Sequence, residues 1–257
     1  PPESMAQPLR ATRDETVAML GDQKPLGRRG PRLGYHAVTT GFLLGEVVRR
    51  VAGCDIRVHL DENFARPLGL RWLGYGVSPP EVDRVARNYH TGPKPFPPFS
   101  TLMRRALGVE YDFAVETLND PRFLTSIFPS ANVVATADEL CRFFEMLRRG
   151  GELDGVRVLE RRTVRRAVAE QSYLEMDLTL ILPFRYSMGF MLGAQWFSLY
   201  GPGTPNAFGH IGLTNIIAWA DPDRALSGAI LTSGKPLIYL EILWLLEALR
   251  RLNAACG

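Results

Sequence analysis

Cysteine is scarce in this 257-residue sequence, and the few that occur have no spacing typical of a bonded site. Cys54, Cys141 and Cys256 are odd in number and far apart, which argues against a disulfide framework. The four histidines are scattered as well, and the zinc motif H-E-x-x-H does not occur. We therefore expect neither a metal nor any other cofactor.

The sequence also lacks a strong excess of charge and a long apolar run. Its 30 basic and 27 acidic residues leave a net charge of +3, too little for a dedicated nucleic-acid binder. Residues 237–252 are largely apolar but fall short of the roughly 20 residues that span a membrane, and we expect them to form a helix packed on a sheet. The start of the sequence holds no apolar segment typical of a signal peptide, so we expect a cytoplasmic protein without a transmembrane segment.

Two widespread motifs are missing too. No G-x-S-x-G occurs, which argues against an α/β-hydrolase. The segment from Gly228 to Pro236 is similar to a phosphate-binding loop, but it has five residues between its glycines, and proline stands where Mg²⁺ binding needs serine or threonine. We interpret it as a strand end and a loop.

Helical patterns dominate the first two thirds of the sequence. Apolar residues recur at helical spacing from Val38 to Val51, and Gly53 is expected to cap that helix. A second clear helix is predicted over Asp138–Arg149, started by Thr136 or Ala137. Further helices are expected near residues 12–20, 57–67 and 160–170 and in parts of 101–128, with a long proline-rich loop over 74–100.

Strand patterns follow the helices. We predict strands near 185–194, 208–213, 215–221 and 225–232, the last two joined as a hairpin. An antiparallel sheet flanked by helices, together with a mostly helical lobe, is an α+β fold. The predicted division is an irregular segment (1–34), the helical lobe (35–175), and the sheet with its C-terminal helix (176–257).

Three separated stretches stand out as carriers of chemistry. In the first, Tyr35 precedes the helix that ends at Gly53. In the second, Pro129–Leu140 leads into a helix and a tight turn that ends at Gly155. The third is Phe208-Gly-His-Ile-Gly212, just before the hairpin.

In this order and at this spacing, the three stretches resemble the serine β-lactamase-related family of class C β-lactamases, family VIII carboxylesterases and D-amino-peptidases. The resemblance runs from about Gly34 to Leu252, and Gly34-Tyr-His36 with Phe208–Gly212 is similar to the bacterial esterases of that family. It implies a β-lactamase/penicillin-binding-protein-like fold and a hydrolase that works through an acyl-serine.

The resemblance also implies roles for particular residues. Tyr35 would shuttle protons, His210-Ile-Gly212 would be the strand element beside the site, and the Leu213 N–H would be the oxyanion donor. His210 would orient the substrate or tune Tyr35. Taken alone, Tyr35 would more often be a buried helix-entry tyrosine, and His210 a structural strand histidine. Further residues expected to line the substrate site are His36, Tyr89, Phe96 and Asn215.

Two departures from the family pattern favour a simple ester over a β-lactam. Ala37 stands where the lactamases carry an asparagine that would bind an amide carbonyl of the substrate. His210 replaces a lysine that would attract the β-lactam carboxylate. We therefore expect a small-molecule ester as the substrate.

A larger departure is the absence of the family's Ser-x-x-Lys pair, the nucleophile and its lysine. The sequence has three lysines, and the residues three positions before them are Gly21, Thr91 and Thr232. Because the sequence also begins without Met, we expect the C-terminal portion of a longer enzyme whose N-terminal segment supplies the pair. Two alternatives stay open: an inactive relic of the fold with a binding or regulatory role, and a β-lactamase or D-amino-peptidase.

Overall fold

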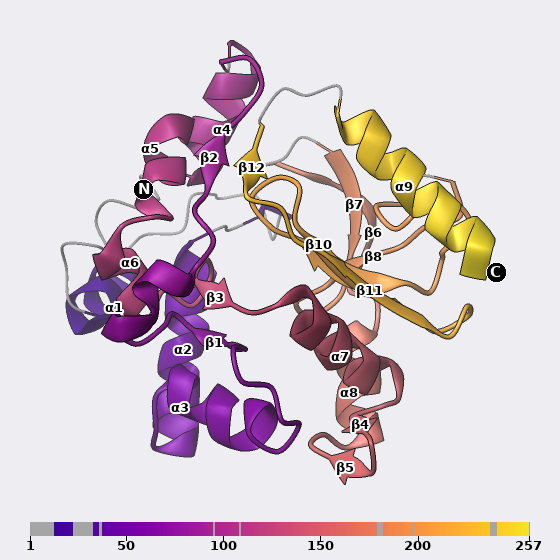
Figure 1. The fold of residues 1–257 in the computed structure, drawn as a ribbon, viewed down its shortest axis with the longest axis horizontal. Helices are drawn as coiled ribbons and strands as arrows, with labels where there is room; N and C mark the ends of the chain where they lie inside the picture. The colour runs from indigo at the N-terminus through magenta and orange to yellow at the C-terminus, as the bar shows by residue number, and fades with distance from the viewer. Residues whose placement is uncertain are drawn as a thin grey trace.

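The structure of the protein, a computed structural model, describes residues 13–22, 33–35, 38–94, 96–107, 109–178, 182–196, 198–236 and 241–256. Short helices make up most of the first half of the chain, and a sheet follows (Figure 1). This order agrees with the α+β fold predicted from the sequence.

The first half of the chain combines helices with two-residue strands. The helices are α1 (Arg13–Gly21), α2 (Thr39–Ala52), α3 (Ile56–Leu60), the π-helix η1 (Asp61–Ala65), the 3-10 helix η2 (Pro79–Arg84), α4 (Phe99–Leu107), α5 (Tyr111–Thr117) and α6 (Pro121–Thr125). The strands are β1 (Gly74–Tyr75), β2 (Tyr89–His90) and β3 (Val133–Val134). Helices α2, α5 and α6 share one core, which includes Phe42, Tyr111, Phe123 and Phe128.

The predicted helix after Tyr35 is confirmed as α2. It ends at Ala52, and Gly53 caps it in the left-handed conformation at φ 72°, with its N–H donated to the Arg49 carbonyl at 3.0 Å. Glycine adopts this conformation without the steric cost of a Cβ. On the buried side of the helix, Phe42 packs edge-on against Phe128, so the start of α2 is held in the core.

Residues 74–100 are less irregular than their proline content predicts. They contain β1, η2 and β2, and α4 begins at Phe99. β1 pairs with β3, and β2 pairs in parallel with β12 (Gly234–Lys235) near the other end of the chain. These pairings depend on distant residues, which a local pattern does not reveal.

A six-stranded antiparallel sheet organises the second half of the chain. Its order is β11 (Leu226–Ile230), β10 (Ile217–Asp221), β9 (Phe208–Ile211), β8 (Met191–Leu192), β7 (Leu182–Tyr186) and β6 (Ser172–Asp177). The predicted hairpin is confirmed as β10 and β11, with Ile217 opposite Ile230. The single strand predicted over 185–194 is two strands, because the chain reverses between Tyr186 and Met191 through Gly189 at φ 118°.

Helices cover both faces of this sheet (Figure 1). α7 (Ala137–Arg148) shares a core with one face, formed in part by Phe144, Met146, Leu147, Phe208, Ala218 and Ala220. α9 (Glu241–Cys256) lies on the other face, where Leu249 shares a core with Ile217 and Trp219. Successive residues of β10 therefore point to opposite helices, as the two-residue period of a strand requires.

Two expectations about helices meet different outcomes. The apolar C-terminal helix does pack on the sheet, and among the described helices none is long and apolar enough to cross a membrane. Sequence order predicts the helix over 138–149 in the helical lobe, but α7 packs on the sheet, because its apolar side needs the β9 and β10 side chains to bury it.

α7 is also tied to the chain before it. The Thr136 side chain accepts the N–H of Glu139, and the Glu139 carboxylate accepts the N–H groups of Thr136 and Trp72, the latter at 2.8 Å. This reciprocal arrangement satisfies the free N–H groups of the first helical turn. After α7 come the hairpin of β4 (Glu152–Leu153) and β5 (Val156–Arg157) and then α8 (Arg161–Val168).

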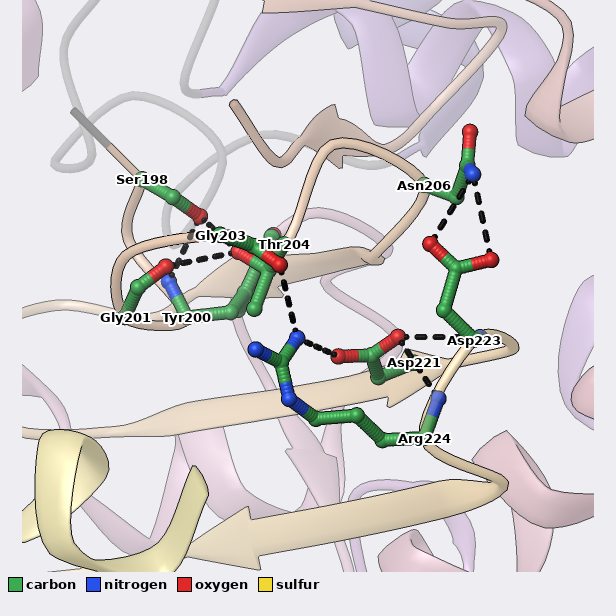
Figure 2. A network of polar contacts seen from close by, with 9 residues as sticks. All are labelled: Ser198, Tyr200, Gly201, Gly203, Thr204, Asn206, Asp221, Asp223 and Arg224. Atoms are coloured by element: carbon green, nitrogen blue, oxygen red, sulfur yellow. Dashed lines mark hydrogen bonds and ion pairs between the residues drawn. The ribbon is translucent and has the colours of Figure 1, made fainter. Parts of the chain in front are cut away.

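A polar network joins the loop between β8 and β9 to the turn between β10 and β11 (Figure 2). The Arg224 guanidinium donates to the Gly203 carbonyl at 2.8 Å and to Asp221 Oδ2 at 2.9 Å. Asp221 is 0 % exposed, and its Oδ1 accepts the N–H of Asp223 at 3.1 Å. The network therefore fixes the loop from which β9 begins.

The division of the chain at residues 34 and 175 stays a prediction. α1 lies before the first of these positions, within the segment expected to be irregular, in which the sequence also predicts a short helix. The second position falls inside β6, so the sheet begins at Ser172.

Candidate active site

Tyr35 and His210 lie side by side, as the sequence pattern predicts. Their ring centroids are 5.9 Å apart and their planes are tilted by 32°. Tyr35 comes just before α2, and His210 lies on β9, an inner strand of the sheet. The fold thus brings together the first and third of the three stretches. The catalytic roles of the two residues remain predictions.

Tyr35 is held by a buried carboxylate. Its backbone N–H donates to Asp177 Oδ1 at 3.2 Å, and the Tyr186 hydroxyl donates to Asp177 Oδ2 at 3.2 Å. Burial raises the pKa of Tyr35 above its ordinary value, and the negative charge of Asp177 raises it further. The phenol of Tyr35 is therefore uncharged at neutral pH in this surrounding.

His210 is also uncharged at neutral pH. Burial lowers the pKa of its imidazole, and this effect outweighs the opposing effect of the hydrogen bond to Ile211. Its Nδ1 lies 2.5 Å from the Ile211 carbonyl oxygen, which can only accept, so Nδ1 carries the proton. The other ring nitrogen, Nε2, is then the acceptor of the ring.

The turn after His210 is sharply bent. The Gly212 N–H donates to the Ile216 carbonyl at 2.9 Å, while Thr214 and Asn215 take positive φ values of 42° and 49°. Such conformations are strained for residues with a Cβ and persist only where neighbours hold them. Here the Tyr111 hydroxyl lies 3.1 Å from Thr214 Oγ1, and the Asn215 carbonyl accepts from Thr232 Oγ1 at 2.9 Å.

Leu213 is the residue in this turn that the sequence assigns to the oxyanion. Among the described residues no acceptor meets its N–H, so that group is free to bind a developing negative charge. Its side chain packs on the core of the first half of the chain. Asn215 contributes its carbonyl to the turn, and the structure shows no contact of its side chain with the Tyr35–His210 pair within the described residues.

The roles of the other predicted lining residues stay predictions. Tyr89 and Phe96 are 57 % and 54 % exposed. His36 lies outside the described residues, as does Ala37.

Asp177 and Tyr186 also lie at Tyr35, and no sequence pattern predicts them. Asp177 lies in a segment with no clear strand pattern, and an acid buried at the end of a strand gives no local signal. Tyr186 falls inside a predicted strand, but its hydroxyl contact depends on how β6 and β7 pair. No local pattern marks either contact.

The arrangement can pass protons and bind an oxyanion. It offers a neutral phenol, a neutral imidazole with one acceptor nitrogen, and the Leu213 N–H, which meets no acceptor in the described part of the chain. The described residues hold no cluster of histidine, cysteine and acidic side chains able to bind a metal ion. In this family the nucleophile would be a serine followed three positions later by lysine, and the 257 residues contain no such pair.

Comparison with known proteins identifies the family of the chain. A beta-lactamase family model matches residues 1–247. The esterase/beta-lactamase LipL of Mycobacterium tuberculosis is 28% identical over 218 residues, covering 79% of this chain and 49% of LipL. The chain spans about half the length of the curated relatives it matches.

Solved structures give the same result for the fold. A penicillin-binding protein homologue from Caulobacter crescentus is 31% identical, with a TM-score of 0.78 over 95% of this chain and 64% of that one. A family VIII carboxylesterase superposes with a TM-score of 0.81 at 24% identity, covering 100% of this chain and 67% of the esterase. The family match over residues 1–247 and these superpositions show that the chain belongs to the beta-lactamase family and has its α+β, penicillin-binding-protein-like fold.

Proposed function

We propose that the full-length protein is a serine hydrolase that cleaves small-molecule esters through an acyl-serine, with Tyr35 as the general base. The observation that carries this proposal is the pairing of Tyr35 with His210, three positions before Leu213, whose N–H meets no acceptor among the described residues. The nucleophilic serine and its lysine would come from a segment of the protein outside these 257 residues.

The surroundings of Tyr35 support the need for that lysine. A phenol is a base only as its phenolate, and ionising Tyr35 beside Asp177 in a buried place is unfavourable. A lysine brought next to Tyr35 would stabilise the phenolate, as opposite charges within a few ångströms do. On this proposal the 257 residues alone lack the nucleophilic serine, and Tyr35 stays protonated and cannot act as the base.

The reaction divides into two similar steps. In acylation, the Tyr35 phenolate takes the serine proton as the serine oxygen bonds to the ester carbonyl carbon. The Leu213 N–H binds the oxyanion of the tetrahedral intermediate. As the carbonyl re-forms, the bond to the leaving alcohol breaks, and Tyr35 gives its proton to the alcohol oxygen. Water then attacks the acyl-serine in the same way and releases the acid.

Esters are favoured over β-lactams for two reasons in the sequence. Ala37 offers no side-chain amide for the substrate, and His210 is a neutral group where a cation would attract a carboxylate. The names of similar proteins leave both reactions open, since LipL is called an esterase/beta-lactamase and a structural neighbour is a family VIII carboxylesterase.

Hydrolysis assays on the full-length protein test this proposal. We expect it to hydrolyse a chromogenic short-chain ester well above buffer and to be at least tenfold less efficient, in kcat/KM, on a chromogenic cephalosporin. Changing the serine of its Ser-x-x-Lys pair to alanine is expected to abolish the ester reaction. Preference for the cephalosporin would favour the β-lactamase alternative, and no turnover of either substrate would favour an inactive binding protein.

A further inference from the structure

Asp177 joins two parts of the chain that lie 142 positions apart in sequence. It ends β6 and is 0 % exposed. Its Oδ1 accepts the Tyr35 N–H at 3.2 Å, and its Oδ2 accepts the Tyr186 hydroxyl at 3.2 Å. The next residue, Leu178, donates its N–H to the Leu33 carbonyl at 3.0 Å. Residues 33–35 therefore run alongside the end of β6, fixed at two points.

We propose that Asp177 is a positioning residue for Tyr35: it fixes the backbone of Tyr35 to the sheet, and its negative charge acts on the phenol of that residue. This inference rests on the proposed function only for its catalytic consequence. The tether and the charge are properties of this chain and can be measured without any enzyme activity.

Burying the Asp177 carboxylate costs free energy, which argues that the residue has a role at this position. A buried charge is unfavourable unless donors surround it. Asp177 receives one donor from the segment before α2 and one from β7. These two donors place the carboxylate between the segment before α2 and β7, which is the place of a residue that positions Tyr35.

Three strands contribute ionisable groups near Tyr35. β6 contributes Asp177, β7 contributes Tyr186, and β9 contributes His210. Burial, the charge of Asp177 and the hydrogen bond to it raise the pKa of Tyr186, so its hydroxyl is neutral. His210 is neutral because burial lowers its pKa. Among these described groups, Asp177 is thus the charged one that acts on Tyr35.

Asp177→Asn separates the charge from the tether. The amide keeps the shape and an oxygen that can accept the Tyr35 N–H, but it removes the negative charge. In protein labelled with 3-fluorotyrosine, whose phenol is more acidic than that of tyrosine, ¹⁹F NMR follows ionisation, and Tyr35→Phe identifies the Tyr35 signal. We expect Asp177→Asn to lower the pKa of Tyr35, because the negative charge that helps to raise it is removed. Asp223→Asn, at an exposed carboxylate in the β10–β11 turn, is the control and should leave it unchanged.

An unchanged Tyr35 titration in folded Asp177→Asn protein would overturn the electrostatic half of the proposal. The tether is tested by Asp177→Ala in the full-length enzyme, where we expect kcat to fall at least tenfold, while Asp177→Asn keeps most of it. Because Tyr35 acts as its phenolate, we also expect Asp177→Asn to move the limb of the pH profile on which activity rises with pH to lower pH. Equal kcat for the alanine variant and the wild type would overturn the tether.

The two proposals fail in different ways. If the full-length protein hydrolyses no ester but Asp177→Asn still shifts the Tyr35 signal, the proposed function fails and the charge assignment stands. If the ester is hydrolysed and neither Asp177 variant has an effect, the positioning role fails and the function stands. Should the alanine variant not fold, the asparagine variant still gives the NMR result.

Discussion

Burial sets the protonation of three residues that carry polar groups into the interior: Tyr35, His210 and Lys235. For each of them the largest cause of the pKa shift is desolvation, which favours the neutral form. Tyr35 and His210 are therefore both neutral, and on the proposed function a lysine next to Tyr35 would stabilise its phenolate. In Lys235 it yields a buried amine that lowers stability while it is charged.

Lys235 gives a prediction about stability. It is 1 % exposed, and its ammonium donates to the Thr232 carbonyl at 2.5 Å. Burial lowers its pKa to about 8, below the unfolded value near 10.5, so the penalty for the buried charge is full below pH 8. We expect Lys235→Met to raise the free energy of unfolding at pH 7 by about 1–3 kcal/mol.

The stability difference between wild type and Lys235→Met depends on pH. Between about pH 8 and 10.5, Lys235 has lost its proton in the folded protein but keeps it in the unfolded chain. The free energy of unfolding of the wild type therefore rises over this range relative to that of the variant. Urea unfolding at pH 7 and pH 10 should therefore show a gain from Lys235→Met that shrinks with pH. Lys94→Met, at an exposed lysine, is the control and should change little at either pH. A loss of stability in Lys235→Met at pH 7 would show that the ammonium is needed by the fold.

At the scale of elements, β9 is held at both of its ends. Before it, the loop of residues 193–207 is bonded to the β10–β11 turn through Arg224 and Asp221 (Figure 2). After it, the turn that carries Leu213 is supported by Tyr111 of α5 and by Thr232. The position of His210 thus depends on contacts from both halves of the chain.

The loop network can be tested on its own. Asp221→Ala removes a fully buried carboxylate and leaves the Arg224 guanidinium without its ion partner. We expect a loss of about 2–4 kcal/mol in the free energy of unfolding, measured by urea denaturation. The neighbouring Asp223→Ala removes an exposed carboxylate that accepts from a surface amide of Asn206, and it should cost less than about 1 kcal/mol. Equal losses for the two variants would contradict this account of the network.

Sequence patterns predicted the helices and strands that are determined by neighbouring residues. α2 has an apolar face and a glycine cap, α7 has a capping threonine and a glycine stop, and the β10–β11 hairpin has its turn residues. The β2–β12 pairing was not predicted, because it joins residues far apart in the chain. The split of the 185–194 strand was also missed, because its reversal at Gly189 depends on a positive φ that the apolar pattern does not show.

At the scale of the whole molecule, the family resemblance predicted that Tyr35 and His210 lie close together, although they are far apart in sequence. Nothing in periodicity relates Tyr35 to His210, and only the order of the three stretches predicted their contact. Asp177 and Tyr186 escaped prediction because they lie outside those stretches and meet Tyr35 only through the pairing of β6 with β7. Tyr89 and Phe96, chosen for their place in a proline-rich segment, are exposed.

The central claim is that Tyr35 is the general base of a serine esterase, and its most direct test is the burst of alcohol released on mixing full-length protein with a chromogenic short-chain ester. We predict that Tyr35→Phe slows this acylation step by roughly 10²–10⁴ without changing the serine nucleophile. Tyr75→Phe, at a half-buried tyrosine on β1, serves as the matched control and should leave the rate within about twofold. A burst of wild-type rate in Tyr35→Phe would contradict the account, since the base would then lie elsewhere.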